Sequence, residues 1–143
     1  MAVWEKLFQV DSKGPMGVDI GLLVLRLGFG GLMLFAHGWG KLVNFGERAP
    51  NFPDPLGVGS VFSLALVTFA EFFCALLLMV GLATRAAAVP LIINMSVITF
   101  IVHAEDPFRQ QEFPMLFGIA FLVLFFTGPG KFSLDALISR KSG

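Results

Sequence analysis

The chain has 143 residues, ten acidic and ten basic side chains, and a mean hydropathy of +0.82. Charged residues make up only 14% of the sequence and hydrophobic residues 56%, whereas soluble domains carry about 25% charged residues. This balance excludes the basic surface that a nucleic-acid partner needs and indicates a small protein embedded in the lipid bilayer. A single cysteine, Cys74, excludes an intrachain disulfide and a CxxC redox pair, and we expect it to be an inert packing residue.

Residues 1–19 form an N-terminal segment that we expect at the cytoplasmic membrane surface. Apolar side chains recur there at helical spacing, with charged and polar residues between them: Val3, Trp4, Leu7 and Phe8. This pattern is typical of an amphipathic helix lying in the membrane interface. A disordered end of the chain is the alternative.

Four runs are long and apolar enough to cross a bilayer, which takes about 20 residues. They are expected at residues 20–39, 59–82, 86–103 and 113–128. The fourth is short, so we expect it to extend a turn upstream or to thin the bilayer locally. Pro90 and Pro114 are expected in the first turns of the third and fourth spans, where proline is tolerated. The predicted fold class is all-α, a four-transmembrane-helix bundle over residues 20–128 with short amphipathic segments at both ends.

Basic residues predict the orientation of the four spans. Six Lys and Arg residues lie before the first span, between the second and third, and after the fourth, whereas three lie in the other two connections. Because cytoplasmic segments are enriched in Lys and Arg, both termini are expected in the cytoplasm. In the tail, residues 129–143, we expect a short amphipathic helix from Ser133 to Lys141, capped by Ser133 or Asp135.

Two ionisable side chains lie well inside the predicted spans, Arg26 in the first and Glu71 in the second. An unpaired charge near the bilayer centre costs at least ~2.5–3.5 kcal/mol, and Glu71 is the only acidic residue well inside any span. Arg26 and Glu71 are therefore expected to form a bidentate ion pair. Such a pair would either order a polar pocket or simply hold the bundle together.

His37 and His103 are expected at similar depth, near the outer ends of the first and third spans, with Lys41 one turn beyond His37. Both histidines are candidate proton relays because histidine titrates near neutral pH; interfacial histidines bonded to loop carbonyls are the alternative. Asn94 points nearly opposite to His103, so only one of the two is expected to face the bundle interior. The candidate catalytic residues are His37, His103 and Glu71. The candidate ligand-binding residues are Arg26, His37, Lys41, Glu71, Asn94 and His103.

Two further patterns bear on a ligand site. A stripe of aromatic side chains on the fourth span is expected to face lipid, with stacking against a quinone ring as the alternative: Phe113, Phe117, Phe121 and Phe125. The connection at residues 40–58 is too long for a simple linker. It is expected either as a lid over the outer layer of the bundle or as a mobile loop. No metal site is expected, and haem held by the two histidines is not expected either.

Four segments appear in a fixed order: RLGFGGLMLFAHGWGKL in the first span, Glu71 followed by LLLMVGLATRAAA, the His103 region with Glu112, and GPGKFSLD after the fourth span. With these segments, over roughly residues 20–135, the chain resembles the DoxX family of small four-helix membrane proteins. Lysine at Lys131 is a departure, since arginine is more usual there. The family's recurring polar groups fall on Arg26, His37, Lys41, Glu71, Arg85 and His103.

The resemblance implies a bacterial cytoplasmic (inner) membrane and a link to respiratory redox chemistry, because the family is named after a subunit of a quinone-coupled oxidation system. Some members are linked to oxidative-stress complexes with superoxide dismutase and a sulfurtransferase. The preferred hypothesis is therefore a redox-linked accessory subunit that binds a quinone or a similar lipophilic electron carrier. Whether the chain is itself catalytic, as a subunit of a quinone-coupled oxidoreductase, stays open.

Two other functions are compatible with the sequence. The first is a non-enzymatic membrane anchor for soluble redox enzymes. The second is a small transporter or proton conduit, which would need homo-oligomerisation because four short helices leave little room for a pathway. The expected partners are the lipid bilayer, soluble redox enzymes and further copies of the chain.

Overall fold

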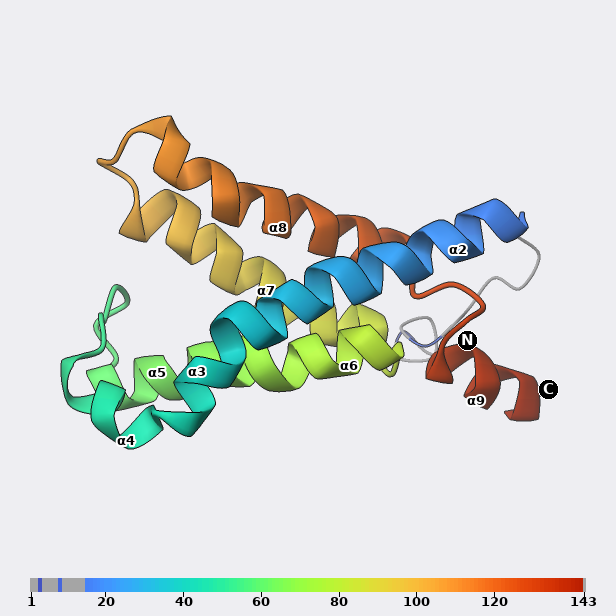
Figure 1. Cartoon of the computed structure of the whole chain (residues 1–143), viewed down its shortest axis with the longest axis horizontal. Helices are drawn as coiled ribbons and strands as arrows, with labels where there is room; N and C mark the ends of the chain where they lie inside the picture. Colours follow the sequence, from blue (N-terminus) through green and yellow to red (C-terminus); the bar gives the residue numbers. More distant parts are fainter. Residues whose placement is uncertain (1–2, 4–7, 9–14, 143) are drawn as a thin grey trace.

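The computed structural model describes residues 3, 8 and 15–142. The helix predicted on the membrane surface near the N-terminus lies outside this continuous range. Within the described residues the chain is helical and contains no strand. Four long helices run antiparallel to their neighbours in sequence and form one bundle (Figure 1). The predicted all-α, four-span fold class is therefore confirmed.

Four helical stretches of the described chain have the length and apolar composition of membrane spans: Met16–Val43, Ser60–Val80, Thr84–Val102 and Phe108–Thr127. The first is built from α2 (Met16–Leu25), η1 (Arg26–Gly30), η2 (Met33–Gly38) and α3 (Trp39–Val43). The second is built from α5 (Ser60–Thr68), η4 (Phe69–Cys74) and α6 (Ala75–Val80). The third is α7 (Thr84–Val97) with η5 (Ile98–Val102), and the fourth is α8 (Phe108–Thr127). Short helices lie outside the spans: α4 (Phe45–Arg48), η3 (Ala49–Asn51) and α9 (Leu134–Ser142).

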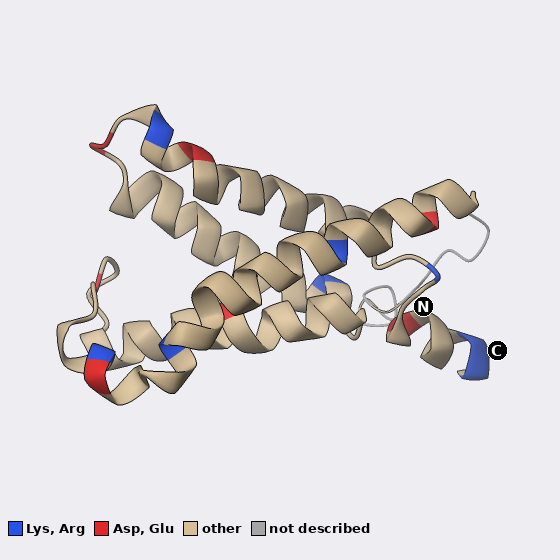
Figure 2. Cartoon of the chain, viewed as in Figure 1, with Lys and Arg blue, Asp and Glu red and all other residues tan. Residues whose placement is uncertain are grey.

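The two ends of the bundle differ in what they carry. We call the end with residues 40–59 and 103–107 the loop end, and the end with the C-terminal tail the terminal end; Figure 1 shows them at left and right. The charged residues gather mainly at these two ends (Figure 2). With four spans, the start of the first span and the segment after the fourth lie on the same side of the membrane, and the prediction that this side is the cytoplasm stays a prediction.

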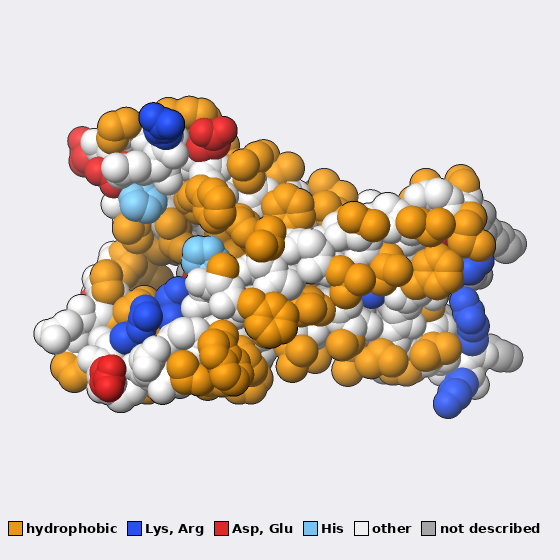
Figure 3. All heavy atoms as spheres, viewed as in Figure 1, with side chains coloured by type: hydrophobic (Ala, Val, Ile, Leu, Met, Phe, Trp, Pro, Cys, Tyr) orange, Lys and Arg blue, Asp and Glu red, His pale blue; other side chains and the backbone are white. Residues whose placement is uncertain are grey.

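The interior of the bundle and its outer surface are both apolar. Fully buried side chains fill the space between the spans: Leu64, Leu78, Leu91, Phe121 and Leu124. Outward-facing Leu, Ile, Val and Phe side chains cover the spans from end to end (Figure 3). Such a surface exceeds what a soluble monomer exposes, whereas lipid chains are as apolar as leucine and solvate it.

Both prolines of the spans lie farther inside their helices than predicted. The third and fourth spans begin at Thr84 and Phe108, so Pro90 and Pro114 are each the seventh residue. The prediction of first-turn prolines is wrong, because both helices start before their most apolar residues. The predicted upstream extension of the fourth span, by contrast, is confirmed.

The aromatic stripe of the fourth span is only partly exposed to lipid. Phe117 and Phe121 are 4% and 0% exposed, whereas Phe113 is largely exposed. The Phe117 ring packs edge-on against Phe29 of the first span, with ring centroids 5.2 Å apart. The prediction of a lipid-facing stripe is therefore wrong for its two central members, which belong to the core.

Hydrogen bonds tie the tail to the terminal end of the bundle. The Ser133 hydroxyl accepts a hydrogen bond from the Ala136 N–H (3.2 Å) and caps α9, which is one of the two predicted options. The Asp135 carboxylate caps a different helix, because it accepts hydrogen bonds from the N–H groups of Ala83 (2.7 Å) and Thr84 (3.1 Å) at the start of α7. A carboxylate at a helix N-terminus also interacts favourably with the helix dipole. The tail therefore holds the start of the third span in place.

Candidate functional site

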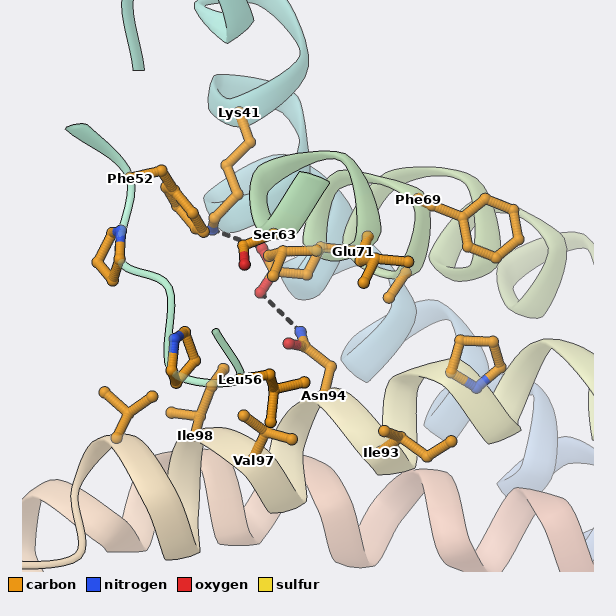
Figure 4. Close-up of a pocket in the computed structure, with 17 residues that line it drawn as sticks. Lys41, Phe52, Leu56, Ser63, Phe69, Glu71, Ile93, Asn94, Val97 and Ile98 are labelled. Carbon is orange, nitrogen blue, oxygen red and sulfur yellow. Dashed lines mark hydrogen bonds and ion pairs between the residues drawn. The ribbon is translucent and has the colours of Figure 1, made fainter. Parts of the chain in front are cut away.

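An apolar cavity lies between the second and third spans toward the loop end (Figure 4). Its volume is about 430 Å³, within the usual range of about 300–1,000 Å³ for small-molecule sites. Its walls come from α5 and η4, from α7 and η5, and from residues 52–56 of the long loop. Among the residues that the structure describes, four polar side chains line it: Lys41, Ser63, Glu71 and Asn94. The cavity therefore offers an apolar volume with polar groups concentrated at one wall.

Three of the predicted ligand-binding residues meet at that wall, and we call Lys41, Glu71 and Asn94 the polar cluster. Lys41 Nζ lies 2.5 Å from Glu71 Oε2, and Asn94 Nδ2 donates a hydrogen bond to Glu71 Oε1 at 3.0 Å. The side chains of Lys41 and Glu71 are 15% and 4% exposed. Both carboxylate oxygens are thus engaged. The ammonium has three N–H groups and the amide two, so both keep capacity to donate to a ligand.

Close packing of the first two spans brings Lys41 to Glu71. Gly38 lies against the main chain of the second span, where a Cβ on Gly38 would be 2.3 Å from the Glu71 carbonyl oxygen. Lys41 follows three residues later on the same helix face, and helical side chains lean toward the helix N-terminus. The ammonium therefore reaches back into the bundle. Gly38 and Glu71 lie in the π-helical turns η2 and η4, a geometry frequent at functional sites.

Replacing Gly38 with alanine is expected to destabilise the protein by about 1–3 kcal/mol, because the new methyl group overlaps rigid main chain. The matched control is Gly28→Ala on the same span, where a Cβ would meet nothing within 4 Å. Unfolding in mixed micelles titrated with SDS compares the two variants with the parent chain. Equal stability of Gly38→Ala and Gly28→Ala would contradict the close crossing at Gly38.

Residues 52–56 form the loop wall of the cavity, and Asp54 anchors them. Asp54 Oδ1 accepts hydrogen bonds from the Val58 N–H (2.9 Å) and the Ser63 hydroxyl (2.8 Å), and Oδ2 accepts one from the Gly59 N–H (2.8 Å). The Gly59 bond, followed by the Ser63 bond, lowers the pKa of Asp54 below its usual range. Of the two predicted alternatives for this loop, a lid or a mobile segment, the contacts favour the lid.

The Asp54 anchor is expected to make part of the stability depend on pH. Because the pKa of Asp54 is lower in the folded chain, its contribution is complete above the ordinary aspartate value of ~3.9 and disappears as pH falls through the lowered pKa. The difference in thermal midpoint between the parent chain and Asp54→Asn should therefore be largest at neutral pH and shrink under strongly acidic conditions. Glu105→Gln, on the other loop-end connection, serves as the control. A difference that stays constant down to acidic pH would refute the anchor.

Arg26 lies at the terminal end, and the predicted ion pair between Arg26 and Glu71 is wrong. The partners of Arg26 on the second span are Leu78 and Met79, which follow Glu71 by about two helical turns, roughly 11 Å along the axis. The depth comparison failed because it assumed that the spans end at the same level, whereas the first span, which starts at Met16, is offset so that Arg26 lies beside the last turn of the second span. In addition, the Arg26 side chain leans back toward that start.

The Arg26 guanidinium joins the end of the second span to the tail. Carbonyls in the last turn of a helix lack the usual partner, and Arg26 Nε and Nη2 donate to those of Leu78 (3.2 Å) and Met79 (3.1 Å). Nη1 donates to the Pro129 carbonyl at 2.7 Å, and both Nη1 and Nη2 donate to the Phe132 carbonyl at 3.0 Å. Carbonyl dipoles therefore surround the buried charge, which has a structural role at this end.

The two histidines lie outside the lining of the cavity. The His37 ring packs against the rings of Phe113 and Phe117, with centroids 6.2 Å away in both cases. His103 Nδ1 lies 2.7 Å from Asp106 Oδ2 in the connection at the loop end. The structure therefore does not bring the histidines to the polar cluster, and their assignment as proton relays stays a prediction.

Asn94, and not His103, faces the bundle interior, which answers the question left open by the helix geometry. Asn94 is buried and bonded to Glu71, whereas His103 is half-buried at the end of its helix. Cys74 is buried in the core. Within the described part of the chain, no group of three or more His, Cys, Asp or Glu side chains is placed to hold a metal ion.

Two side-chain contacts of the structure were not predicted from the sequence. The first is the pairing of Lys41 with Glu71. Its one signal in the sequence is Gly38, one helical turn before Lys41, because a small residue allows two helices to cross closely. The second contact joins Asp19 Oδ1 to the main-chain N–H of Lys131 at 2.9 Å. That bond is made by the main chain and does not depend on the side chain at position 131.

Comparisons with known proteins agree with this architecture. The family model of DoxX matches residues 21–104. The chain is 28% identical to the uncharacterized membrane protein Rv3486 of Mycobacterium tuberculosis, over 97% of this chain and 90% of that protein. It is 30% identical to the inner membrane protein YqjF of Escherichia coli, over 86% of this chain and 95% of that protein.

A third relative is an uncharacterized protein of Haemophilus influenzae, 29% identical over 87% of both chains. No solved structure matches the chain significantly. The family match covers more than half of the sequence, and it includes most of the first span, the second and third spans and the whole polar cluster. The chain therefore belongs to the DoxX family of membrane proteins.

Proposed function

We propose that this protein is a redox-linked accessory subunit of the bacterial inner membrane that binds a quinone, or a similar lipophilic electron carrier, in the cavity between the second and third spans. One observation carries the proposal: apart from Ser63, whose hydroxyl bonds Asp54, the cavity is apolar except for the polar cluster. This is the arrangement that orients a small polar head within an apolar site.

The polar cluster fits the head of a quinone. A quinone presents carbonyl oxygens at opposite edges of a flat ring, and such oxygens accept hydrogen bonds from N–H donors. Lys41 and Asn94 supply those donors, and Glu71 orients both because each of its oxygens holds one of them. A bound quinone would supply two-electron, two-proton redox chemistry. The residues of this chain would bind the head, orient it and exclude water.

The experiment is a binding titration in nanodiscs with a short-chain ubiquinone as the probe. Asn94→Leu is expected to weaken binding by about tenfold to a hundredfold, because a hydrogen bond within a charged network is lost from an apolar site. Ser96→Ala is the matched control on the same helix, since its hydroxyl is exposed and bonds the Ile92 carbonyl. Thermal unfolding of each variant is measured alongside. Absence of saturable binding to the parent chain would refute the proposal.

A membrane anchor for soluble redox enzymes is the second candidate, and α9 is the observation that favours it. The helix exposes Leu134, Leu137 and Ile138 and ends with Arg140 and Lys141. This amphipathic helix is held at the terminal end, where a soluble partner would have access if that end is cytoplasmic.

The anchor predicts that a soluble redox enzyme co-purifies with the parent chain and is lost with Leu137→Ser combined with Ile138→Ser. Both positions lie outside the capping contacts of the tail. Asn94→Leu should retain the partner. The opposite pattern, with partner loss only in Asn94→Leu, would contradict the anchor.

A further inference from the structure

Part of the cavity lining is exposed on the outer surface of the bundle, on the side of the spans as well as at the loop end. Its deepest lining residues, Ala70, Glu71 and Asn94, are buried. Two lining residues that flank them on facing helices are exposed on the outer surface, Phe69 at 51% and Ile93 at 57%. Figure 4 shows both side chains at the edge of the cavity, on the second and third spans. We call the exposed part of the lining at Phe69 and Ile93 the lateral portal.

The lateral portal lies at the depth of the hydrocarbon core. Phe69 is nine residues after Ser60, the first residue of the second span, and Ile93 is nine residues before Val102, the last residue of the third. Nine residues of helix rise about 14 Å, close to half of the ~30 Å hydrocarbon thickness. The rim of the portal therefore meets lipid chains rather than water.

The cavity lining also extends beyond the portal along the third span, toward the terminal end. Pro90, which lines it, lies twelve residues before the end of the third span at Val102, or about 18 Å along the helix. A proline inside a helix removes one main-chain hydrogen bond, which leaves this wall less constrained than a regular helix. The polar cluster lies on the loop-end side of Pro90. The cavity lining therefore runs along the spans from the loop to Pro90, and Glu71 and Asn94 lie near its deep end, at the depth of the lateral portal.

On the basis of the function proposed above, we infer that the ligand is a single-tailed amphiphile that enters and leaves from the bilayer through the lateral portal. Its polar head contacts Lys41 and Asn94, and its apolar tail passes between Phe69 and Ile93 and stays in the surrounding lipid. A long isoprenoid or alkyl chain does not fit in a volume of about 430 Å³ together with a ring. The tail must therefore leave the cavity, and the portal is an apolar exit at the right depth.

The loop side of the cavity fits this route poorly. The loop contributes apolar lining side chains only: Phe52, Pro53, Pro55 and Leu56. Ser63 of the second span also lines the cavity, but its hydroxyl already donates a hydrogen bond to Asp54. A path for a water-soluble substrate would need polar groups along its length. The loop wall therefore covers the head of the ligand, and the tail points away from it.

Photocrosslinking of the protein in nanodiscs tests the direction of the tail. Two decyl-ubiquinone probes are used, one with a diazirine on the ring and one with a diazirine near the end of the decyl chain. The ring probe should modify the segment around Lys41 on the first span, whereas the chain-end probe should modify the segment around Phe69 on the second span and leave Lys41 unlabelled. Both reactions should be prevented by excess unlabelled decyl-ubiquinone.

The possible failures are distinguishable. Ring labelling at the polar cluster with chain-end labelling at residues 52–56 would overturn the lateral route while leaving the proposed function in place. Labelling that the unlabelled quinone does not prevent would overturn the proposed function and the route together.

A kinetic variant gives an independent test. Ile93→Trp narrows the portal, so association and dissociation of decyl-ubiquinone should slow together by about tenfold, with little change in Kd, because only the barrier between lipid and cavity is raised. Ile119→Trp, at an exposed position on α8 that does not line the cavity, is the matched control. Unchanged rates in Ile93→Trp would overturn the route.

Discussion

Arg26→Ala is expected to lower the free energy of unfolding by about 3–5 kcal/mol, the range for removing one partner from a buried charged network. The side chain is 1% exposed, and it makes five hydrogen bonds to main-chain carbonyls of the second span and the tail. Each carbonyl left without a donor in an apolar setting costs about 1–3 kcal/mol. Reversible unfolding in micelles titrated with SDS measures the loss.

Two further variants separate charge from geometry at Arg26. Arg26→Lys keeps the charge but has three N–H donors on a single nitrogen, where arginine has five on a planar fork. It should therefore recover only part of the stability. Arg109→Ala, at an exposed position near the start of α8, is the control and should change stability by less than about 0.5 kcal/mol. A loss in Arg26→Ala no larger than in Arg109→Ala would contradict the assigned role.

Lys41→Met is expected to destabilise the protein by a similar amount, about 3–5 kcal/mol, because it leaves the Glu71 carboxylate in an apolar wall without its cation. Lys41 Nζ is 2.5 Å from Glu71, whose side chain is 4% exposed. Asn94 would remain as a neutral donor to Glu71, and one neutral hydrogen bond does not replace a charged partner.

The double variant Lys41→Met with Glu71→Gln should be more stable than Lys41→Met alone, because no unpaired charge is left in the wall. The cycle of the two single variants and the double variant isolates the coupling between the side chains. We expect a coupling energy of about 1–3 kcal/mol. Additive effects of the two substitutions would show that the pair does not interact in the membrane.

The two polar sites of the bundle thus have different roles. At the terminal end, Arg26 donates all its hydrogen bonds to main-chain carbonyls and so holds the second span and the tail together. At the cavity, the polar cluster satisfies its carboxylate and retains donor capacity on Lys41 and Asn94. Variants at Arg26 should therefore change stability, whereas Asn94→Leu should change ligand binding first.

Much of the fold could be predicted from composition and spacing. Long apolar runs require helices in a bilayer, because every main-chain polar group must be satisfied within the segment. Four spans are correctly predicted on this ground, whereas the upstream extension of the fourth span and the cap of α9 at Ser133 were each one of two predicted alternatives. Helix ends were less accurate: the first span is longer at both ends than residues 20–39. Polar residues such as Asp19 and Lys41 lie within the helix although they interrupt the hydropathy pattern.

The pairing of the buried charges could not be predicted in the same way. The charges inside the predicted spans favour an ion pair between Arg26 and Glu71, because these are the two opposite charges well inside them. However, main-chain carbonyls at a helix end satisfy a guanidinium without any acid. The predicted first span ended at residue 39, so Lys41 was assigned to the loop. In the structure Lys41 belongs to the end of the first span, and its side chain reaches back to Glu71.

The sequence by itself determined that the chain is helical, crosses the membrane four times and belongs to the DoxX family, because hydropathy, length and ordered motifs are local properties of the chain. Only the tertiary structure decided which polar groups meet. The contact at Gly38, the cavity between the second and third spans, and the binding of Arg26 by the tail all depend on how helices far apart in sequence are tilted and offset. An offset of two helical turns moves a side chain by about 11 Å, farther than an arginine reaches, and hydropathy carries no information about that offset.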